Sequence, residues 1–126
     1  PPATRVDTSM SAHWSERLAA VYLQYHGLTL LSRNYRCRQG ELDLVMRDTS
    51  ESPHITVFVE VRYRKGTNYG RPEETILVAK QRKLILTARH YLQAQNTLEA
   101  ATRFDVVAVI QPNYLPRITW IKDAFA

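Results

Sequence analysis

Residues 40–46, GELDLVM, and residues 55–62, ITVFVEVR, decide the fold of this chain. In the second stretch Ile55, Val57, Val59 and Val61 alternate with Thr56, Phe58, Glu60 and Arg62. A period of two residues is typical of a β-strand with two different faces. We therefore predict strands over Glu41–Met46 and Ile55–Arg62. A turn at Gln39-Gly40 precedes the first of them, and a turn or loop over Asp48–Pro53 joins the two.

Helical and extended patterns continue on both sides of these strands. The predicted order is helix, three strands, helix, strand and a short last strand. The remaining elements are a helix over 11–26, a strand over 28–36, a helix from Pro72 to about Gln95, and strands over 103–110 and 117–121. Three strands between two helices favour an antiparallel meander joined to a parallel strand. The sequence thus predicts an α/β fold with a mixed sheet flanked by helices.

Length and composition bound the class of protein. A chain of 126 residues that is 44% hydrophobic and 23% charged has room for one domain. We expect that domain over 11–126, with 1–10 a disordered or cloning-derived segment. No apolar run approaches the ~20 residues that cross a bilayer, and Pro1 to Ser11 lacks the apolar core of a signal peptide. The single cysteine, Cys37, cannot form an internal disulfide. We therefore expect a cytoplasmic protein without a membrane partner.

The net charge of +5 makes polyanions plausible partners. Basic residues form three groups that contain no acid: Arg33, Arg36 and Arg38; Arg62, Arg64, Lys65 and Arg71; Lys80, Arg82, Lys83 and Arg89. One interpretation is a solvated basic surface, and the other is a face that binds phosphates. For the second we name Arg36, Arg38, Arg64, Lys65, Arg71 and Lys83, with Tyr69 as a side chain that stacks on bases.

Acidic side chains stand where apolar neighbours predict burial. Glu60 lies inside an apolar strand, and Asp43 shares a strand face with Glu41. Glu16 falls on the apolar side of the first helix. A buried carboxylate needs a partner. If the two strands are neighbours, Asp43 and Glu60 converge, and a divalent cation would relieve their repulsion. Oxygen ligands alone suit Mg²⁺ or Mn²⁺.

Three runs together resemble the YraN-like family of bacterial proteins. They are GELDLV at 40–45, VFVEVRYR at 57–64 and RFDVV at 103–107. The resemblance extends over about Ala12 to Ile121. It implies a restriction-endonuclease-like fold of the PD-(D/E)xK class, which is related to archaeal Holliday-junction resolvases. It also implies a metal-dependent endonuclease acting on DNA, with branched or damaged structures as candidate substrates.

The resemblance also assigns roles to individual residues. Asp43 and Glu60 take the places of the two metal-binding acids, and Glu16 takes the place of the helix acid that completes the metal site. Arg62 stands where the motif usually has lysine. Arginine stabilises charge but is a poor base, because its pKa exceeds 12. Lys80 is a candidate for the missing amine, and its other interpretation is a lysine at the edge of a buried helix.

Several functions therefore stay open at this point. The first is a nuclease-like protein that depends on Mg²⁺ or Mn²⁺, with catalytic residues Asp43, Glu60, Arg62, Glu16 and Lys80. The second is a nucleic-acid-binding module that kept the fold without catalysis. The third is a basic adaptor for an acidic protein. A homodimer is compatible with each. In the structural interpretation, Glu60 pairs with Arg62, and Asp43 pairs with Arg36 or Arg38 across a hairpin.

Overall fold

The elements follow the predicted order. The structure is a computed structural model that describes residues 7–66, 76–111 and 113–125. The elements are α1 (Asp7–Tyr25), β1 (Leu28–Cys37), β2 (Gly40–Asp48), β3 (Ile55–Arg64), α2 (Val78–Ala94), β4 (Ala101–Ile110) and β5 (Arg117–Phe125). The prediction of a mixed α/β fold is confirmed. Neither helix in the described ranges is long and apolar enough to span a membrane.

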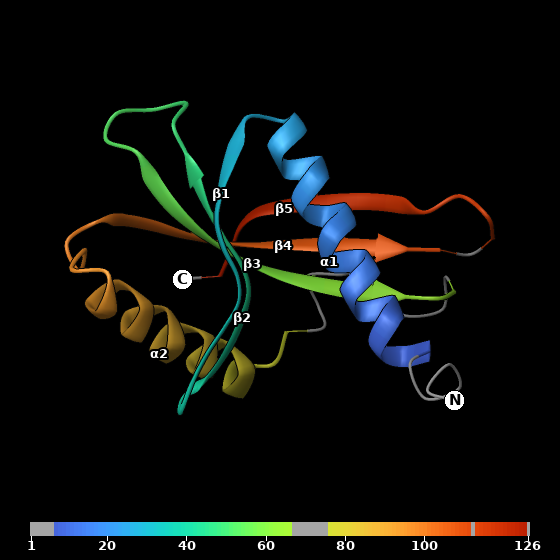
Figure 1. Ribbon diagram of the computed structural model, residues 1–126, viewed down its shortest axis with the longest axis horizontal. Coiled ribbons are helices and arrows are strands. Elements are labelled where there is room, and N and C mark those ends of the chain that lie inside the picture. The colour runs from blue at the N-terminus through green and yellow to red at the C-terminus, as the bar shows by residue number, and fades with distance from the viewer. Residues whose placement is uncertain (1–6, 67–75, 112, 126) are drawn as a thin grey trace.

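All the strands form one sheet in the order β1-β2-β3-β4-β5 (Figure 1). β1, β2 and β3 form an antiparallel meander, β4 runs parallel to β3, and β5 is antiparallel to β4. α2 lies in the connection from β3 to β4. Because β4 is parallel to β3, this connection must bring the chain back to the end of the sheet where β3 begins. The meander and the crossover are those that three strands between two helices predict.

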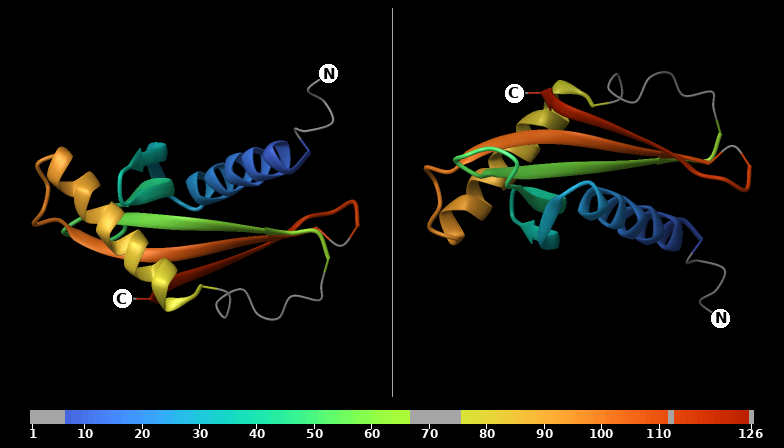
Figure 2. Two further views of the ribbon diagram at one scale, coloured as in Figure 1. Left: turned by 90° about the horizontal axis from the view of Figure 1, so that it is seen from below. Right: turned by 90° about the horizontal axis from the view of Figure 1, so that it is seen from above.

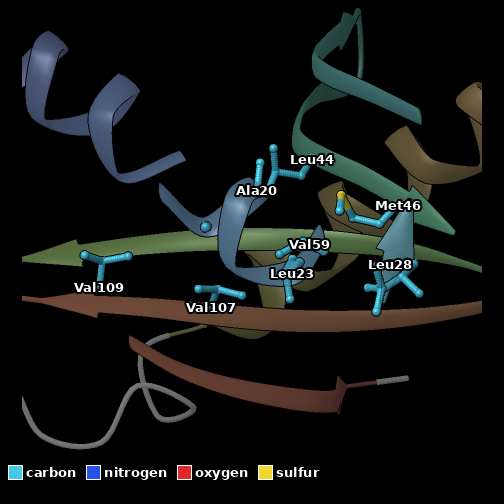
Figure 3. Packing of buried hydrophobic residues seen from close by; sticks show 10 residues of the cluster. Ala20, Leu23, Leu28, Leu44, Met46, Val59, Val107 and Val109 are labelled. Atoms are coloured by element: carbon cyan, nitrogen blue, oxygen red, sulfur yellow. The ribbon is translucent and has the colours of Figure 1, made fainter. Parts of the chain in front are cut away.

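Each face of the sheet has its own hydrophobic core. On the first face Val57 and Val59 pack with Ala19, Ala20 and Leu23 of α1 (Figure 3). On the second face the intervening residue of β3, Phe58, packs with residues of α2 and its neighbours: Leu42, Val45, Leu84, Ala88, Tyr91 and Leu92. Alternation along β3 therefore supplies both cores. Figure 2 shows α1 lying along one side of the sheet.

Both helices depart in detail from their predicted form. α1 begins at Asp7, four residues before the predicted start at Ser11. Two apolar stripes run along this helix in the sequence: one is Trp14, Leu18, Val21, Tyr22 and Tyr25, and the other is Ala12, Ala19, Ala20 and Leu23. Of the first stripe, Val21 and Tyr25 face outward, at 62% and 87% exposed, while Leu18 and Tyr22 are partly buried against the core, so the sheet covers this stripe only in part. The stripe that contains Ala19 and Ala20 allows the closer approach, and it is the buried one.

The second helix begins later than expected. Ile76 and Leu77 precede α2, which starts at Val78, so the predicted start at Pro72 is wrong. Pro72 itself lies outside the described residues. In the sequence, Leu77 and Ile85 are predicted to share the apolar face of this helix with Leu84, Ala88, Tyr91 and Leu92, but they are 72% and 38% exposed. Buried Thr87 takes a place on that face because its hydroxyl donates to the Lys83 carbonyl.

A buried ion-pair network joins the end of β2 to the first half of β4 and the end of β5. Asp105 is fully buried and accepts two hydrogen bonds from Arg103, at 2.9 and 3.0 Å. It also accepts the Trp120 indole N–H at 2.9 Å and the Asp123 amide at 2.9 Å. Arg103 reaches Asp48 at 3.0 Å. Hydrogen bonds from Ser50, followed by Arg103, lower the pKa of Asp48 to about 2.

Candidate active site

β2 and β3 separate at Asp43, and this fork holds the candidate site. Their paired residues run from Asp48↔Ile55 to Leu44↔Val59. At the next step the backbone ladder gives way to a side chain, because the Val61 amide donates to Asp43 Oδ2 at 2.8 Å. Past the fork β2 continues in its pairing with β1, and β3 continues in its pairing with β4. Asp43 therefore stands where the sheet divides.

Asn34 of β1 has an unusual backbone conformation beside the fork. It lies between Arg33 and Tyr35, which pair with Leu44 and Leu42, so it is opposite Asp43. Its φ of 54° lies in the left-handed region, which asparagine tolerates better than most residues. The hairpin changes face here. Leu44 packs against the α1 core and Leu42 against the α2 core. Strand alternation over Glu41–Met46 would place Leu42 and Leu44 on one face, and the structure departs from it here.

Asp43 and Glu60 meet at the fork. Glu60 is 8% exposed and lies on the same face of β3 as Phe58. Burial, followed by the charge of Asp43, raises the pKa of Glu60 to about 7, while Lys80 and Arg62 act in the opposite direction. Burial also raises the pKa of Asp43. Asp43 accepts hydrogen bonds from Val61 and from the Glu60 carboxyl, so Glu60 is the acid that keeps the proton longer.

Glu16 approaches the same carboxylate from α1. It lies within hydrogen-bonding reach of the side chains of Asn34 and Asp43. Partial burial raises the pKa of Glu16 to about 7, with smaller contributions from the charges of Asp43 and Glu41. The structure thus brings together the acids that the sequence singled out, from α1, β2 and β3. Sequence reasoning missed Asn34, although an asparagine inside a strand was an available signal.

Basic side chains face this acidic cluster from two elements. Lys80 at the start of α2 places Nζ 3.6 Å from Glu60 Oε2, and its side chain is 47% exposed. Arg62 lies two residues beyond Glu60 on β3 and is half-buried. Burial is the main cause that lowers the pKa of Arg62, followed by the charge of Arg64. Glu60 therefore pairs with Lys80. The alternative in which the acids have only a structural role predicted that Glu60 would pair with Arg62.

A divalent cation fits the chemistry of the donors at this site. The described residues include no group of three His, Cys, Asp or Glu side chains in metal-coordinating geometry. The fit rests instead on Glu16, Asp43 and Glu60, which offer only oxygen atoms and oppose each other's ionisation. Hard cations such as Mg²⁺ take carboxylate oxygens and lower this cost of ionisation.

Comparison with known proteins identifies relatives over almost the whole chain. Residues 15–109 match the model of the uncharacterised protein family UPF0102, the YraN-like family. This chain belongs to the UPF0102 family. A UPF0102 protein from Nitrosococcus oceani is 44% identical over 128 residues, which cover 98% of this chain and 95% of the relative. A UPF0102 protein from Stutzerimonas stutzeri is 44% identical over 94% of this chain and 97% of the relative. Another from Chromohalobacter salexigens is 48% identical over 87% of this chain and 85% of the relative.

A weaker likeness connects the UPF0102 chain to a solved structure. That structure is Pyrococcus furiosus SfsA in complex with Ca²⁺, with 15% identity and a TM-score of 0.36. The match covers 93% of this chain and 64% of that chain, less than two thirds of its length.

Basic side chains of this UPF0102 chain gather beside the fork. The β1–β2 turn packs against α2 at Gly40, where an added Cβ would lie 2.9 Å from Thr87 Oγ1. Exposed Arg38 is in this turn, and exposed Lys83 lies one helical turn before Thr87. Arg36 pairs with Glu41 at 3.2 Å, so Glu41 and not Asp43 is its acidic partner.

Arg64 and Lys65, which were also predicted to bind phosphate, lie at the end of β3. Arg64 is half-buried and donates from Nη1 to the Tyr63 carbonyl at 3.0 Å, and Lys65 is exposed. Tyr69 and Arg71 lie outside the described residues. Arg64 is two residues from Arg62 on the same strand, so its side chain lies about 7 Å further along the same face.

Asn34→Ala in the UPF0102 chain is expected to lower the free energy of unfolding by about 1–2 kcal/mol, because alanine is strained in the left-handed region. Asn34→Gly keeps the backbone relaxed, so we expect it to stay within about 1 kcal/mol of wild type. Urea unfolding at pH 7 measures both. An equal loss in the two variants would show that the side-chain bond to Glu16, and not the φ of 54°, determines stability here.

Proposed function

We propose that this chain is a metal-dependent nuclease-like protein with a restriction-endonuclease-like domain that hydrolyses phosphodiester bonds in DNA. The observation that carries the proposal is the convergence of Glu16, Asp43 and Glu60 from three different elements at a fork in the sheet. Buried carboxyl groups that repel each other lower the stability of the fold near neutral pH. Groups whose pKa values are shifted in this way concentrate at functional sites. The fork opens beside Lys80 and Arg62.

Each side chain has a distinct role in this proposal. Asp43 and Glu60 hold Mg²⁺ or Mn²⁺, and Glu16 completes the ligand set from α1. When bound, the cation supplies an activated water and neutralises charge on the phosphate. The Val61 amide fixes the Asp43 carboxylate through its 2.8 Å bond, so that this ligand needs little reorganisation.

The cations bind the substrate. Arg62 stays protonated and offers several N–H donors to the oxygens of the scissile phosphate. Lys80 is held beside Glu60 by their ion pair at 3.6 Å, so its ammonium group orients the same phosphate from α2. Arg38, Lys83, Arg64 and Lys65 contact neighbouring phosphates of the strand.

One observation favours a second function. Position 62, which follows the second acid by two residues, is an arginine and cannot act as a base at neutral pH. If Lys80 does not replace that base, the fold serves as a nucleic-acid-binding module without catalysis. Binding would still weaken log-linearly with salt concentration, because phosphate contacts release counterions.

The test is cleavage of labelled single-stranded, duplex, flap and four-way DNA with Mg²⁺, with Mn²⁺ and with EDTA. We expect cutting by wild type only with a divalent cation. Asp43→Asn, purified in the same way, controls for contaminating nucleases and should not cut. Glu99→Gln is the matched control, because Glu99 is exposed and precedes β4 far from the fork, and it should cut like wild type.

The other outcomes assign the function differently. Salt-dependent binding without cutting would assign the protein to the second function, a nucleic-acid-binding module without catalysis. If the protein neither cuts nor binds DNA, both nucleic-acid functions are excluded and the basic adaptor remains. Cutting that persists in Asp43→Asn would show that the fork is not the active site.

A further inference from the structure

A cleft lies on the α2 face of the sheet, at the C-terminal end of α2. It is a cleft of about 450 Å³, within the range of small-ligand sites. Its floor comes from adjacent strands, with Arg47 of β2 paired in register with Thr56 of β3. Tyr91 and Gln95 form the wall on the side of α2, and His54 reaches it from the β2–β3 connection.

The cleft is separate from the fork. Arg47 lies four residues from Asp43, which is about 13 Å along a strand. Between them Val45 and Phe58 are covered by Leu84 and Ala88 of α2, so packed side chains divide the two sites. A ligand of the cleft therefore does not touch the carboxyl cluster.

The charge of the cleft is uncompensated. The Arg47 guanidinium forms no ion pair or hydrogen bond with any residue that the structure describes, and no Asp or Glu is among the described residues that line the cleft. By contrast, Arg103 at the start of β4 binds two carboxylates. The exposed Arg47 guanidinium shares this concavity with an imidazole and three hydroxyl-bearing side chains, Thr56, Tyr91 and Thr97, and such a set favours a phosphate group.

The remaining lining favours an organic group on that phosphate. Leu31, Tyr91 and Ala100 give the cleft an apolar side next to Arg47. Tyr91 is 7% exposed, so its ring is a fixed part of the wall. Gln95 adds an amide that can donate and accept at the edge of a planar ring.

We propose that this cleft binds a small organic phosphate, in which a phosphate monoester bonded by Arg47 and His54 is attached to a planar group packed on Leu31 and Tyr91. A free mononucleotide and the 5′ end of a nucleic-acid strand present this same chemistry. The proposal is independent of catalysis at the fork.

The test is calorimetric titration in EDTA with adenosine 5′-monophosphate, adenosine and inorganic phosphate. We expect one nucleotide per chain, with adenosine and inorganic phosphate each binding at least about tenfold more weakly. Arg47→Gln should weaken nucleotide binding by at least about tenfold. Arg82→Gln, an exposed arginine on α2, is the matched control and should bind like wild type. Melting curves check that each variant is folded.

The arms of the experiment separate the sources and the sites. A 5′-phosphorylated trinucleotide that binds more tightly than the mononucleotide, and loses this in Arg47→Gln, would support the proposal with a strand end as the ligand. Equal affinity for adenosine and its monophosphate, or for inorganic phosphate and the monophosphate, would overturn it. So would unchanged binding in Arg47→Gln. Because Asp43→Asn should bind normally, failure of the nuclease proposal leaves this result intact.

Discussion

Glu60→Gln is expected to stabilise the protein at pH 8 in EDTA and, on the proposed mechanism, to reduce metal-dependent cleavage by on the order of a thousandfold. The folded pKa of Glu60 is raised from 4.5 to about 7. The contribution of this acid to stability is therefore fully present below pH 4.5 and is lost as the pH rises to about 7. Glutamine cannot ionise and avoids this loss.

The Glu60→Gln variant is expected to gain stability while it loses cleavage activity, and these opposite changes distinguish it from a variant that is merely misfolded. Discounted for coupling to Asp43, the gain at pH 8 is about 2 kcal/mol, and it disappears at pH 4. Urea unfolding at both pH values measures it, and the cleavage panel measures activity. Glu99→Gln is the control, because it removes one exposed carboxylate and should change neither. An equal change in stability at the two pH values would contradict the assignment of the raised pKa to Glu60.

Asp105→Asn is expected to lower the free energy of unfolding by about 3–5 kcal/mol, which is the usual cost of removing one partner from a buried ion pair. Asp105 is fully buried and accepts from Arg103, Trp120 and the Asp123 amide. An asparagine has one acceptor oxygen in place of two and leaves the Arg103 guanidinium, whose side chain is only 15% exposed, with Asp48 as its remaining acid.

This loss is a large part of the 5–15 kcal/mol that stabilises a typical domain. Thermal melting followed by circular dichroism measures it. Asp123→Asn is the matched control, because Asp123 is exposed, its φ of 54° suits asparagine, and only its backbone amide takes part in the network. A loss below about 1 kcal/mol in Asp105→Asn would mean that water replaces the missing acceptor.

The alternation of side chains made the sheet predictable. Val57, Val59 and Phe58 identify β3 from the sequence, and they divide between the two cores as a period of two requires. Helix faces were less predictable. α1 carries two apolar stripes, and only packing on the sheet decides that Leu23 is buried while Tyr25 is exposed.

The sequence predicted which acidic residues form the candidate site but not how they are arranged in space. Glu16 and Glu60 are conspicuous because each interrupts an apolar pattern, and Asp43 is conspicuous because it would converge with Glu60 if their strands are neighbours. Their arrangement depends on the fork, and Asn34 opposite Asp43 has a φ of 54°, a backbone property that a residue pattern does not encode. The pairing of Lys80 with Glu60 depends in turn on where α2 begins, and the sequence placed that start too early.

The bond from the Val61 amide to Asp43 makes one backbone proton a reporter of the site. Its neighbours in β3 bond to backbone carbonyls, so their nuclear magnetic resonance signals respond to the sheet as a whole. The Val61 signal responds in addition to the charge and rotation of a single carboxylate. Protonation of Asp43, capture of a cation or opening of the hairpin would each move this signal or speed its exchange with deuterium. The fork can therefore be observed without a substrate.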